Sequence, residues 1–187
     1  WTLLGVGGID ETDPLAYGYM GMHGWKHVNK AIQSSDLLIA LGMRFDDRVT
    51  GSVSTYAPHA QIIHVDIDPS EIGKNVAVDI PIVGDVGNVL RSLIKAVPEV
   101  DPVTRKDYLD ELAQWRSESE SISWHGSGGW KEGLLTADYV MQRLGEMTQH
   151  DATVVADVGQ HQMWLARYYG FKRPDSHLSS GGLGTMG

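Results

Sequence analysis

Three short segments of this sequence place polar and charged side chains where a phosphate or a nucleotide could be held. Residues 154–164 have the pattern of a strand, a turn at Gly159 and a helix. A helix that begins directly after a parallel strand presents free N–H groups and the positive end of its dipole, and open α/β folds bind phosphate there. An ordinary strand–helix turn that contains a glycine explains the same pattern equally well.

The second segment is a pair of aspartates, Asp66 and Asp68, at the end of an apolar run over residues 61–68. An acid at the end of a buried strand commonly accepts a hydrogen bond from a ribose hydroxyl in dinucleotide-binding folds. Alternatively, Asp68 or Ser70 caps a short helix that begins here. The two interpretations are compatible with each other.

The third segment, residues 42–51, follows another apolar run and contains Arg44, Asp46, Asp47 and Arg48. A guanidinium group binds phosphate or carboxylate through two parallel hydrogen bonds, so these arginines suit an anionic ligand. The alternative is a surface loop whose charges pair with each other.

Other motifs are weaker. Residues 182–187 match G-x-G-x-x-G only formally, because at most a stub of strand precedes them and no helix follows within the sequence. A glycine-rich loop that presents its backbone to a flat ligand remains possible there. Of the eight histidines, only His23 and His27 are four residues apart, without an H-E-x-x-H pattern. We therefore expect no histidine metal site, and there is no G-x-S-x-G nucleophile motif.

Composition narrows the function classes further. The 187 residues include 24 acidic and 15 basic side chains, for a net charge of −9. Such a chain is a poor candidate for non-specific binding to nucleic acid or to an anionic membrane surface. It has no cysteine, which excludes disulfides, thiolate metal sites and a cysteine nucleophile within it. No apolar run reaches the roughly 18 residues that a membrane span needs.

The elements that would position these segments alternate between strands and helices. Residues 36–43 and 61–68 are short apolar runs typical of buried parallel strands, and residues 25–35 suit a helix. Residues 86–97 repeat apolar side chains at helical spacing, and Pro98 ends that helix. The pattern predicts an α/β layered fold with parallel sheets.

The second half begins with a break. Residues 106–123 are polar and helical in pattern, and residues 124–130 are glycine-rich, so we expect a helix followed by a loop. Another α/β unit follows, with a helix after Thr136, a strand over residues 152–157 and a helix over residues 160–169. The helix after Thr136 is expected from apolar side chains at Val140, Leu144 and Met147.

Six runs of residues resemble one family in consistent order. They are residues 20–24, 42–51, 64–75, 84–86, 158–164 and 180–187. Together they are similar to the catalytic large subunit of acetolactate synthase (acetohydroxyacid synthase), a thiamine diphosphate-dependent family. The runs R-F-D-D-R-V-T-G and G-Q-H-Q-M-W are the most specific of the six.

The resemblance implies two incomplete domains of a larger enzyme. Residues 1–100 would be the C-terminal part of a Rossmann-like, FAD-binding central domain. Residues 101–133 would be a linker, and residues 134–187 the N-terminal part of a thiamine diphosphate-binding domain. The abrupt ends at Trp1 and Gly187 are then expected to be cut edges.

The resemblance also implies which residues meet each cofactor. Those expected to bind FAD are Thr2, Leu3, Leu4, Gly21, Met22, His23, Gly42, Arg44, Asp46, Arg48, Val49, Asp66, Ile67, Glu71, Gly84, Asp85, Val86, Gln162 and Met163. Those expected to bind thiamine diphosphate are Val158, Gly159, Gln160, His161, Gly184 and Met186, while Met22 and Arg48 would also line the substrate channel. The family's catalytic glutamate and its magnesium-binding G-D-G…N motif have no counterpart here. We therefore expect no catalytic residue and no metal ligand in this chain.

The activity implied is the decarboxylation of pyruvate and the condensation of the remaining two-carbon unit with a second pyruvate or with 2-oxobutyrate. This is the first step of branched-chain amino acid biosynthesis. Thiamine diphosphate, Mg²⁺ and FAD would be the cofactors of the complete enzyme, with FAD in a structural part. A homodimer or homotetramer, with a possible regulatory small subunit, is expected, in the cytoplasm of bacteria or in an organelle of plants or fungi. The 187 residues alone are expected to be inactive.

Two alternatives remain from the sequence. The chain could be a non-catalytic module that binds an adenine dinucleotide through Arg44, Arg48 and Asp66. It could also belong to another thiamine diphosphate enzyme, such as a pyruvate oxidase or a glyoxylate carboligase.

Overall fold

A computed structural model describes residues 1–99, 101–121, 130–131 and 133–186. The chain forms two compact units. The first combines Trp1–Val28 with Arg116–Gly187, and the second is Asn29–Trp115. Residues from the beginning of the chain thus pack with residues from its C-terminal part. The predicted domains, in contrast, follow one another along the chain, and their boundaries stay predictions.

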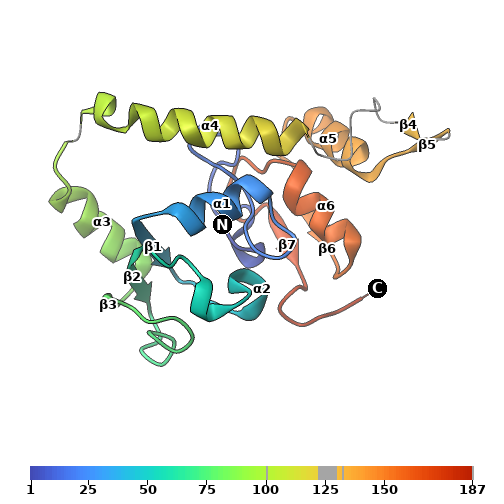
Figure 1. The fold of residues 1–187 in the computed structure, drawn as a ribbon. Helices are drawn as coiled ribbons and strands as arrows, with labels where there is room; N and C mark the ends of the chain where they lie inside the picture. Colours follow the sequence, from blue (N-terminus) through green and yellow to red (C-terminus); the bar gives the residue numbers. More distant parts are fainter. Residues whose placement is uncertain (100, 122–129, 132, 187) are drawn as a thin grey trace. The chain divides into compact units, whose positions relative to one another are not determined.

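The second unit contains a three-stranded parallel sheet in the order β1-β2-β3 (Figure 1). The strands are β1 (Leu37–Leu41), β2 (Gln61–Asp66) and β3 (Ile80–Val83). Leu37 pairs with Gln61, and Ile63 pairs with Ile80. The two strands predicted from apolar runs are confirmed with shorter limits, and β3 is an addition that the sequence did not predict.

Burial in this sheet is uneven. In the central strand β2, Ile62 and Val65 are buried and His64 is wholly inaccessible. In β1, the prediction of a buried strand is wrong for one face, because Leu37 and Ile39 are 48% and 44% exposed. Alternate side chains of a strand point to opposite faces, and the odd-numbered face of β1 is open to solvent.

Two helices of this part of the chain, α1 (Lys26–Ser34) and α3 (Val86–Ala96), fall where the pattern predicts them. The helix α2 (Asp47–Thr50) and a 3₁₀ turn at Val53–Thr55 were not predicted. The apolar side of α3 is less covered than expected. Val86 and Val89 are half-buried, whereas Ile94 is 75% exposed and no α3 residue is fully buried. The predicted stripe is therefore only partly covered, and its last residues, Ile94 and Val97, are exposed.

The middle of the chain is mainly one long helix. A 3₁₀ turn (Pro102–Arg105) leads into α4 (Lys106–Ser121), which confirms the predicted polar helix over its described residues. Most of the glycine-rich loop predicted over residues 124–130 lies outside the described residues. Its last residue belongs to β4 (Trp130–Lys131), which pairs antiparallel with β5 (Leu134–Leu135), so the loop prediction is wrong there.

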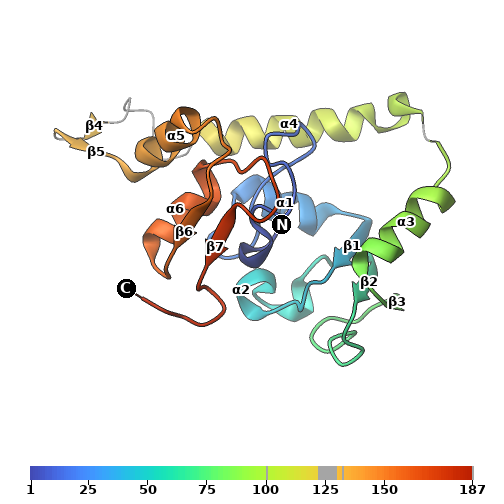
Figure 2. The same ribbon diagram turned by 180° about the vertical axis from the view of Figure 1, so that it is seen from behind.

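The first unit carries a second parallel pair, β6 (Val154–Ala156) and β7 (His177–Ser179), with α6 (Gln160–Tyr168) beside it (Figure 2). The helix predicted after Thr136 is α5 (Ala137–Met147). Its predicted apolar residues are exposed, however: Val140 by 41%, Leu144 by 39% and Met147 by 77%. Asp138 and Gly145 are the buried positions of α5 instead. A Cβ at Gly145 would lie 2.6 Å from the carbonyl oxygen of Tyr169, so only glycine permits this close packing.

The core of the first unit joins the two ends of the chain. Tyr169 and Phe171 are wholly buried in a cluster with Val6, Tyr19 and Leu165. Glu11 reinforces it, because its carboxylate accepts hydrogen bonds from the backbone N–H groups of Gly7 (2.9 Å) and Phe171 (3.1 Å). Burial raises the pKa of the Glu11 carboxyl. Across the described ranges, no helix is long and apolar enough to cross a bilayer.

Candidate functional site

The turn between β6 and α6 has the form that the sequence predicts for a phosphate site. Asp157 and Val158 follow β6, and Gly159 stands at the N-cap of α6 with φ of 154°. A Cβ at Gly159 would lie 2.8 Å from Cε1 of His161, so no other residue fits without displacing that ring. The first N–H groups of a helix have no partner within the helix, and Gly159 leaves their approach open.

The glycine-rich loop of residues 180–186 lies directly against this turn. The Val158 N–H donates a hydrogen bond to the Thr185 carbonyl at 2.9 Å. The Ser180 carbonyl accepts hydrogen bonds from the N–H groups of Leu183 (2.8 Å) and Gly184 (3.0 Å), which folds the loop tightly. Two segments that the resemblance assigns to one cofactor, the turn at Val158 and the loop at Gly184, are therefore brought together.

Ser180 also links the loop to the turn through its side chain. Its Oγ lies 3.3 Å from Oδ1 of Asp157 and 3.2 Å from the Thr185 carbonyl oxygen, both acceptors for the one hydroxyl proton. Met186, near the end of the loop, is 76% exposed. The loop thus has a fixed base and an accessible tip.

Gln162 and Met163, which the resemblance assigns to FAD, lie in the first turns of α6. Gln162 is only 3% exposed, and its amide donates to Oγ of Ser179 at 2.7 Å. Met163 is half-buried. The buried Gln162 side chain therefore already serves an internal contact of the first unit, and its role toward FAD stays a prediction.

The predicted FAD residues near the start of the chain also belong to the first unit. Thr2 precedes the 3₁₀ turn Leu3–Gly5, and Leu4 is 64% exposed. A Cβ at Gly181 would lie 3.7 Å from Cδ2 of Leu4, so Leu4 reaches the glycine-rich loop. Met22 is 59% exposed and His23 is also exposed, on a turn that the Gly24 N–H closes onto the Gly21 carbonyl at 3.0 Å.

In the second unit, predicted FAD residues gather at the carboxyl edge of the sheet. The Gly42 N–H donates to the Val65 carbonyl at 2.8 Å, directly after β1. The Gly84 N–H donates to the Asp66 carbonyl at 2.9 Å, directly after β3. Because the three strands are parallel, Gly42, Asp66 and Gly84 occupy one edge, where open α/β sheets bind their ligands.

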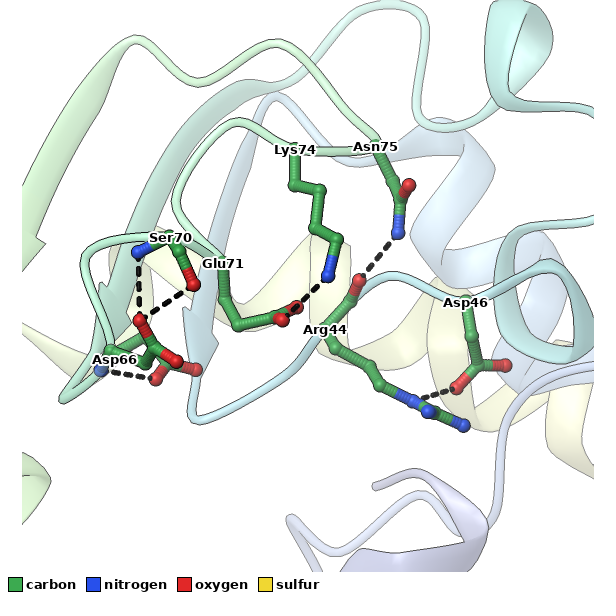
Figure 3. Close-up of polar contacts among 8 residues, drawn as sticks. Arg44, Asp46, Asp66, Ser70, Glu71, Lys74 and Asn75 are labelled. Carbon is green, nitrogen blue, oxygen red and sulfur yellow. Dashed lines mark hydrogen bonds and ion pairs between the residues drawn. The ribbon is translucent and has the colours of Figure 1, made fainter.

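The arginine- and aspartate-rich segment forms a capped helical turn at this edge. The Asp46 side chain accepts the Arg48 N–H at 3.0 Å and so caps α2. Its other oxygen pairs with Nε of Arg44 at 3.0 Å, as Figure 3 shows. The alternative of internally paired charges is confirmed for Arg44 and Asp46. The Arg44 side chain is 65% exposed, and such an ion pair contributes at most about 1 kcal/mol. An incoming anion can therefore redirect this guanidinium group.

The acids after β2 form a hydrogen-bonded turn. Oδ1 of Asp66 accepts the Asp68 N–H at 2.9 Å, and Oδ1 of Asp68 accepts the Ser70 N–H at 2.8 Å and its hydroxyl at 2.7 Å (Figure 3). The hydroxyl and N–H of Ser70 lower the pKa of the Asp68 carboxyl. Residues 69–73 form turns and no helix begins at Asp68 or Ser70, so the predicted alternative of a capped short helix is wrong. Ile67, between the two acids, is 73% exposed.

The two loops of this edge are joined. The Asn75 side-chain amide donates to the Arg44 carbonyl at 3.0 Å, and Glu71 pairs with Lys74 at 2.7 Å (Figure 3). Asp85 caps α3 by accepting the Asn88 N–H at 2.9 Å. Carboxylates accept hydrogen bonds from ribose hydroxyls, and arginines bind phosphate. This edge therefore suits a ligand that has both groups.

Several residues of these sites were not predicted. Ser179, Ser180 and Asn75 hold the loops in place, and only the tertiary hydrogen bonds identify them. A serine pair directly before a glycine cluster is the sole sequence signal for the first two.

The predicted cofactor-binding residues lie outside the cavity of the first unit, and they form no metal-binding group among the described residues. The described residues contain no group of three or more His, Cys, Asp or Glu side chains that could hold a metal ion. A cavity of about 580 Å³ is lined by Trp25, Arg116 and Arg167 among others, and none of the predicted cofactor residues lines it. The candidate cofactor surfaces are open loop edges instead.

Comparison with known proteins agrees with this architecture. Residues 1–93 match the family described as "Thiamine pyrophosphate enzyme, central domain", and residues 157–187 match "Thiamine pyrophosphate enzyme, C-terminal TPP binding domain". The chain therefore belongs to the thiamine pyrophosphate enzymes, with parallel α/β domains as predicted. Within that class it is a homologue of the acetolactate synthase large subunit.

The relatives come from archaea, bacteria and plants. The chain is 45% identical over 188 residues to the probable acetolactate synthase large subunit of Methanocaldococcus jannaschii, covering 100% of this chain and 32% of that protein. It is 44% identical over 192 residues to acetolactate synthase of Mycobacterium bovis (100% and 30%). It is 43% identical over 188 residues to probable acetolactate synthase 2, chloroplastic, of Oryza sativa subsp. japonica (100% and 28%). The chain thus spans about a third of the length of these relatives.

Proposed function

We propose that this chain contributes cofactor-binding parts of an acetolactate synthase. The enzyme would decarboxylate pyruvate and join the remaining two-carbon unit to a second pyruvate or to 2-oxobutyrate. The observation that carries the proposal is the hydrogen bond between Val158 and Thr185, since it makes one surface of two segments that the resemblance assigns to thiamine diphosphate.

The residues of this surface fit the cofactor. The N-terminal N–H groups of α6, opened by Gly159, would bind the diphosphate, with Gln160 and His161 adding side-chain donors. Backbone groups at Gly184 and Met186 would hold the aminopyrimidine ring. When bound, thiamine diphosphate supplies the carbanion stabilisation that decarboxylation of a 2-oxo acid needs, and the protein orients the reactants and excludes water.

The carboxyl edge of the β1–β2–β3 sheet would bind FAD. Asp66 would accept a hydroxyl hydrogen bond, Arg44 would bind phosphate, and Gly42 and Gly84 would leave the backbone accessible. Arg48 and Met22 would in addition line the substrate channel. The flavin would have a structural part and take no net electrons.

Other components would come from outside these 187 residues. The Mg²⁺ ligands and the catalytic glutamate would lie in other parts of the enzyme, because the family's glutamate and its G-D-G…N motif have no counterpart in this sequence. The complete subunit would form a homodimer or homotetramer, with a regulatory small subunit as a possible addition, and would act in the bacterial cytoplasm or in a plant or fungal organelle.

An activity assay on the complete protein tests this proposal. With pyruvate, thiamine diphosphate, Mg²⁺ and FAD, we expect acetolactate and CO₂ in equal amounts after each two pyruvates consumed. The 187 residues alone are expected to form none. A folded complete protein that binds all three cofactors and releases acetate or no product would contradict the proposal, and acetate would favour a pyruvate oxidase.

A further inference from the structure

We propose that Gln162 and Ser179 are positioning residues that hold the glycine-rich loop at the correct distance from the diphosphate-binding turn. The inference rests on the proposed function, because it concerns the same thiamine diphosphate surface. Neither side chain needs to touch the cofactor. They act through the loop of residues 180–186, whose backbone would hold the aminopyrimidine ring.

The Ser179 hydroxyl joins the helix to the loop. Its oxygen accepts the Gln162 amide at 2.7 Å and the Gly181 N–H at 3.1 Å. Gln162 lies in the first turn of α6, whose N-terminus faces the proposed diphosphate site. Gly181 is the first glycine of the loop. A single oxygen atom therefore connects the two cofactor-binding segments.

The contact is buried and tightly packed. Gln162 is 3% exposed, so water does not readily replace its hydrogen bond to Ser179. A Cβ at Gly181 would lie 2.7 Å from Nε2 of Gln162, so a larger residue there would displace the Gln162 amide or move the loop away from the helix, and either disturbs the contact with Ser179. The packing thus sets the spacing between helix and loop.

This spacing matters because one cofactor would contact both segments. Its diphosphate would be fixed at the N-terminus of α6 and its ring at the loop, so a shift of the loop misplaces the ring while the diphosphate stays bound. A misplacement of about 1 Å in a catalytic group can reduce the rate about 100-fold. We therefore expect these residues to affect the rate constant kcat more than the KM for pyruvate.

The test uses the complete protein with the variants Ser179→Ala, Ser179→Thr and Gly181→Ala. Ser179→Ala removes the shared oxygen, and Ser179→Thr keeps it. Gly181→Ala leaves the hydroxyl in place but crowds the Gln162 amide that donates to it. Ser92→Ala is the matched control, because Ser92 is exposed on α3 and its hydroxyl donates to the Asn88 carbonyl of its own helix. Tryptophan fluorescence measures the affinity for thiamine diphosphate. Circular dichroism of the bound aminopyrimidine ring reports the orientation of that ring.

Ser179→Ala and Gly181→Ala are expected to lower kcat at least about tenfold, with the KM for pyruvate changed less than about twofold. The aminopyrimidine dichroism should weaken in both, and Ser179→Thr should restore both signals. Wild-type kcat and dichroism in either alanine variant would overturn the inference while leaving the proposed function intact. If Ser179→Ala does not fold, Gly181→Ala alone decides. A wild-type protein that binds no thiamine diphosphate would overturn the proposed function and the inference with it.

Discussion

The Val158 N–H and the Thr185 carbonyl oxygen are 2.9 Å apart and hydrogen-bonded, which joins the turn before α6 to the glycine-rich loop after β7. This contact lies beyond the carboxyl ends of β6 and β7, whose parallel pairing ends at Ala156 and Ser179. Because parallel strands end at the same edge of a sheet, the segments that follow them meet there. A ligand held by the turn is thus also within reach of the loop.

Gly159 is the position of this turn at which a substitution should be most harmful. Gly159→Ala introduces a Cβ at 2.8 Å from the His161 ring and places alanine at a φ of 154°. We expect a loss of about 1–3 kcal/mol in the free energy of unfolding and weaker thiamine diphosphate binding. Urea unfolding and a fluorescence titration measure the two effects. Gly182→Ala is the control, since a Cβ there meets nothing within 4 Å, and equal effects of both substitutions would refute this reasoning.

The wild-type side chain of His64 is expected to lower the free energy of unfolding of the second unit. The side chain is fully buried in β2 against the ring of Phe45, and neither ring nitrogen has a hydrogen-bond partner among the described residues. His64→Leu removes both unpaired nitrogens at similar volume, so we expect a gain of about 1 kcal/mol in the free energy of unfolding. His64→Ala removes the same nitrogens but leaves a cavity and is expected to destabilise the protein. If leucine destabilised as much as alanine, the unpaired nitrogens would not be the cause.

Asp85 has a capping role that can be separated from its predicted role toward FAD. Its carboxylate accepts the Asn88 N–H at the start of α3. Asp85→Ala is expected to cost about 1 kcal/mol of unfolding free energy, while Asp85→Asn keeps the cap and most of the stability. Thermal unfolding without added cofactor gives the comparison. Identical melting temperatures for the two variants would show that the cap contributes nothing.

His27 should make stability depend on pH. Burial lowers the pKa of its imidazole, although Nε2 donates a hydrogen bond to the Tyr17 carbonyl at 2.9 Å. The unfolded chain has the ordinary pKa of about 6.5 and is protonated first as the pH falls. Burial of the neutral His27 imidazole therefore contributes its full stability above about pH 6.5. This contribution decreases as the pH falls toward the lower pKa of the folded state.

The comparison of wild type with His27→Gln isolates this effect, because glutamine can still donate to Tyr17 but does not titrate. We expect the wild type to lose stability relative to the variant between pH 7 and pH 5. Burial raises the pKa of Glu11 and lowers that of His177, and both contributions cancel in the difference. A difference that does not change with pH would exclude His27 as the cause.

Much of the fold follows from local patterns. The apolar runs at β1 and β2 and the helical spacing in α3 are strong signals. β3 was missed because Pro81 lies within only four residues. The buried face of α5 was also missed, because it depends on Gly145 approaching Tyr169 and not on the apolar residues of the helix. Such close approaches are properties of the folded packing and leave no periodic signal.

In the candidate sites, the residue types carry a local signal, whereas the contacts that hold the loops do not. Arginines and acids after strands, and a glycine between a strand and a helix, indicate ligand binding wherever parallel strands end. The contacts that hold these loops, from Ser179, Ser180 and Asn75, join residues distant in sequence or lie within irregular segments, so only the structure reveals them.

The most direct test of the central claim is a crystal structure of the complete protein with thiamine diphosphate and Mg²⁺. The account predicts that the diphosphate accepts hydrogen bonds from the α6 N-terminus at Gly159, Gln160 and His161, with the aminopyrimidine ring against Gly184 and Met186. The Val158–Thr185 hydrogen bond should remain. Thiamine diphosphate bound away from the turn and loop, or contacting only one of them, would contradict the account.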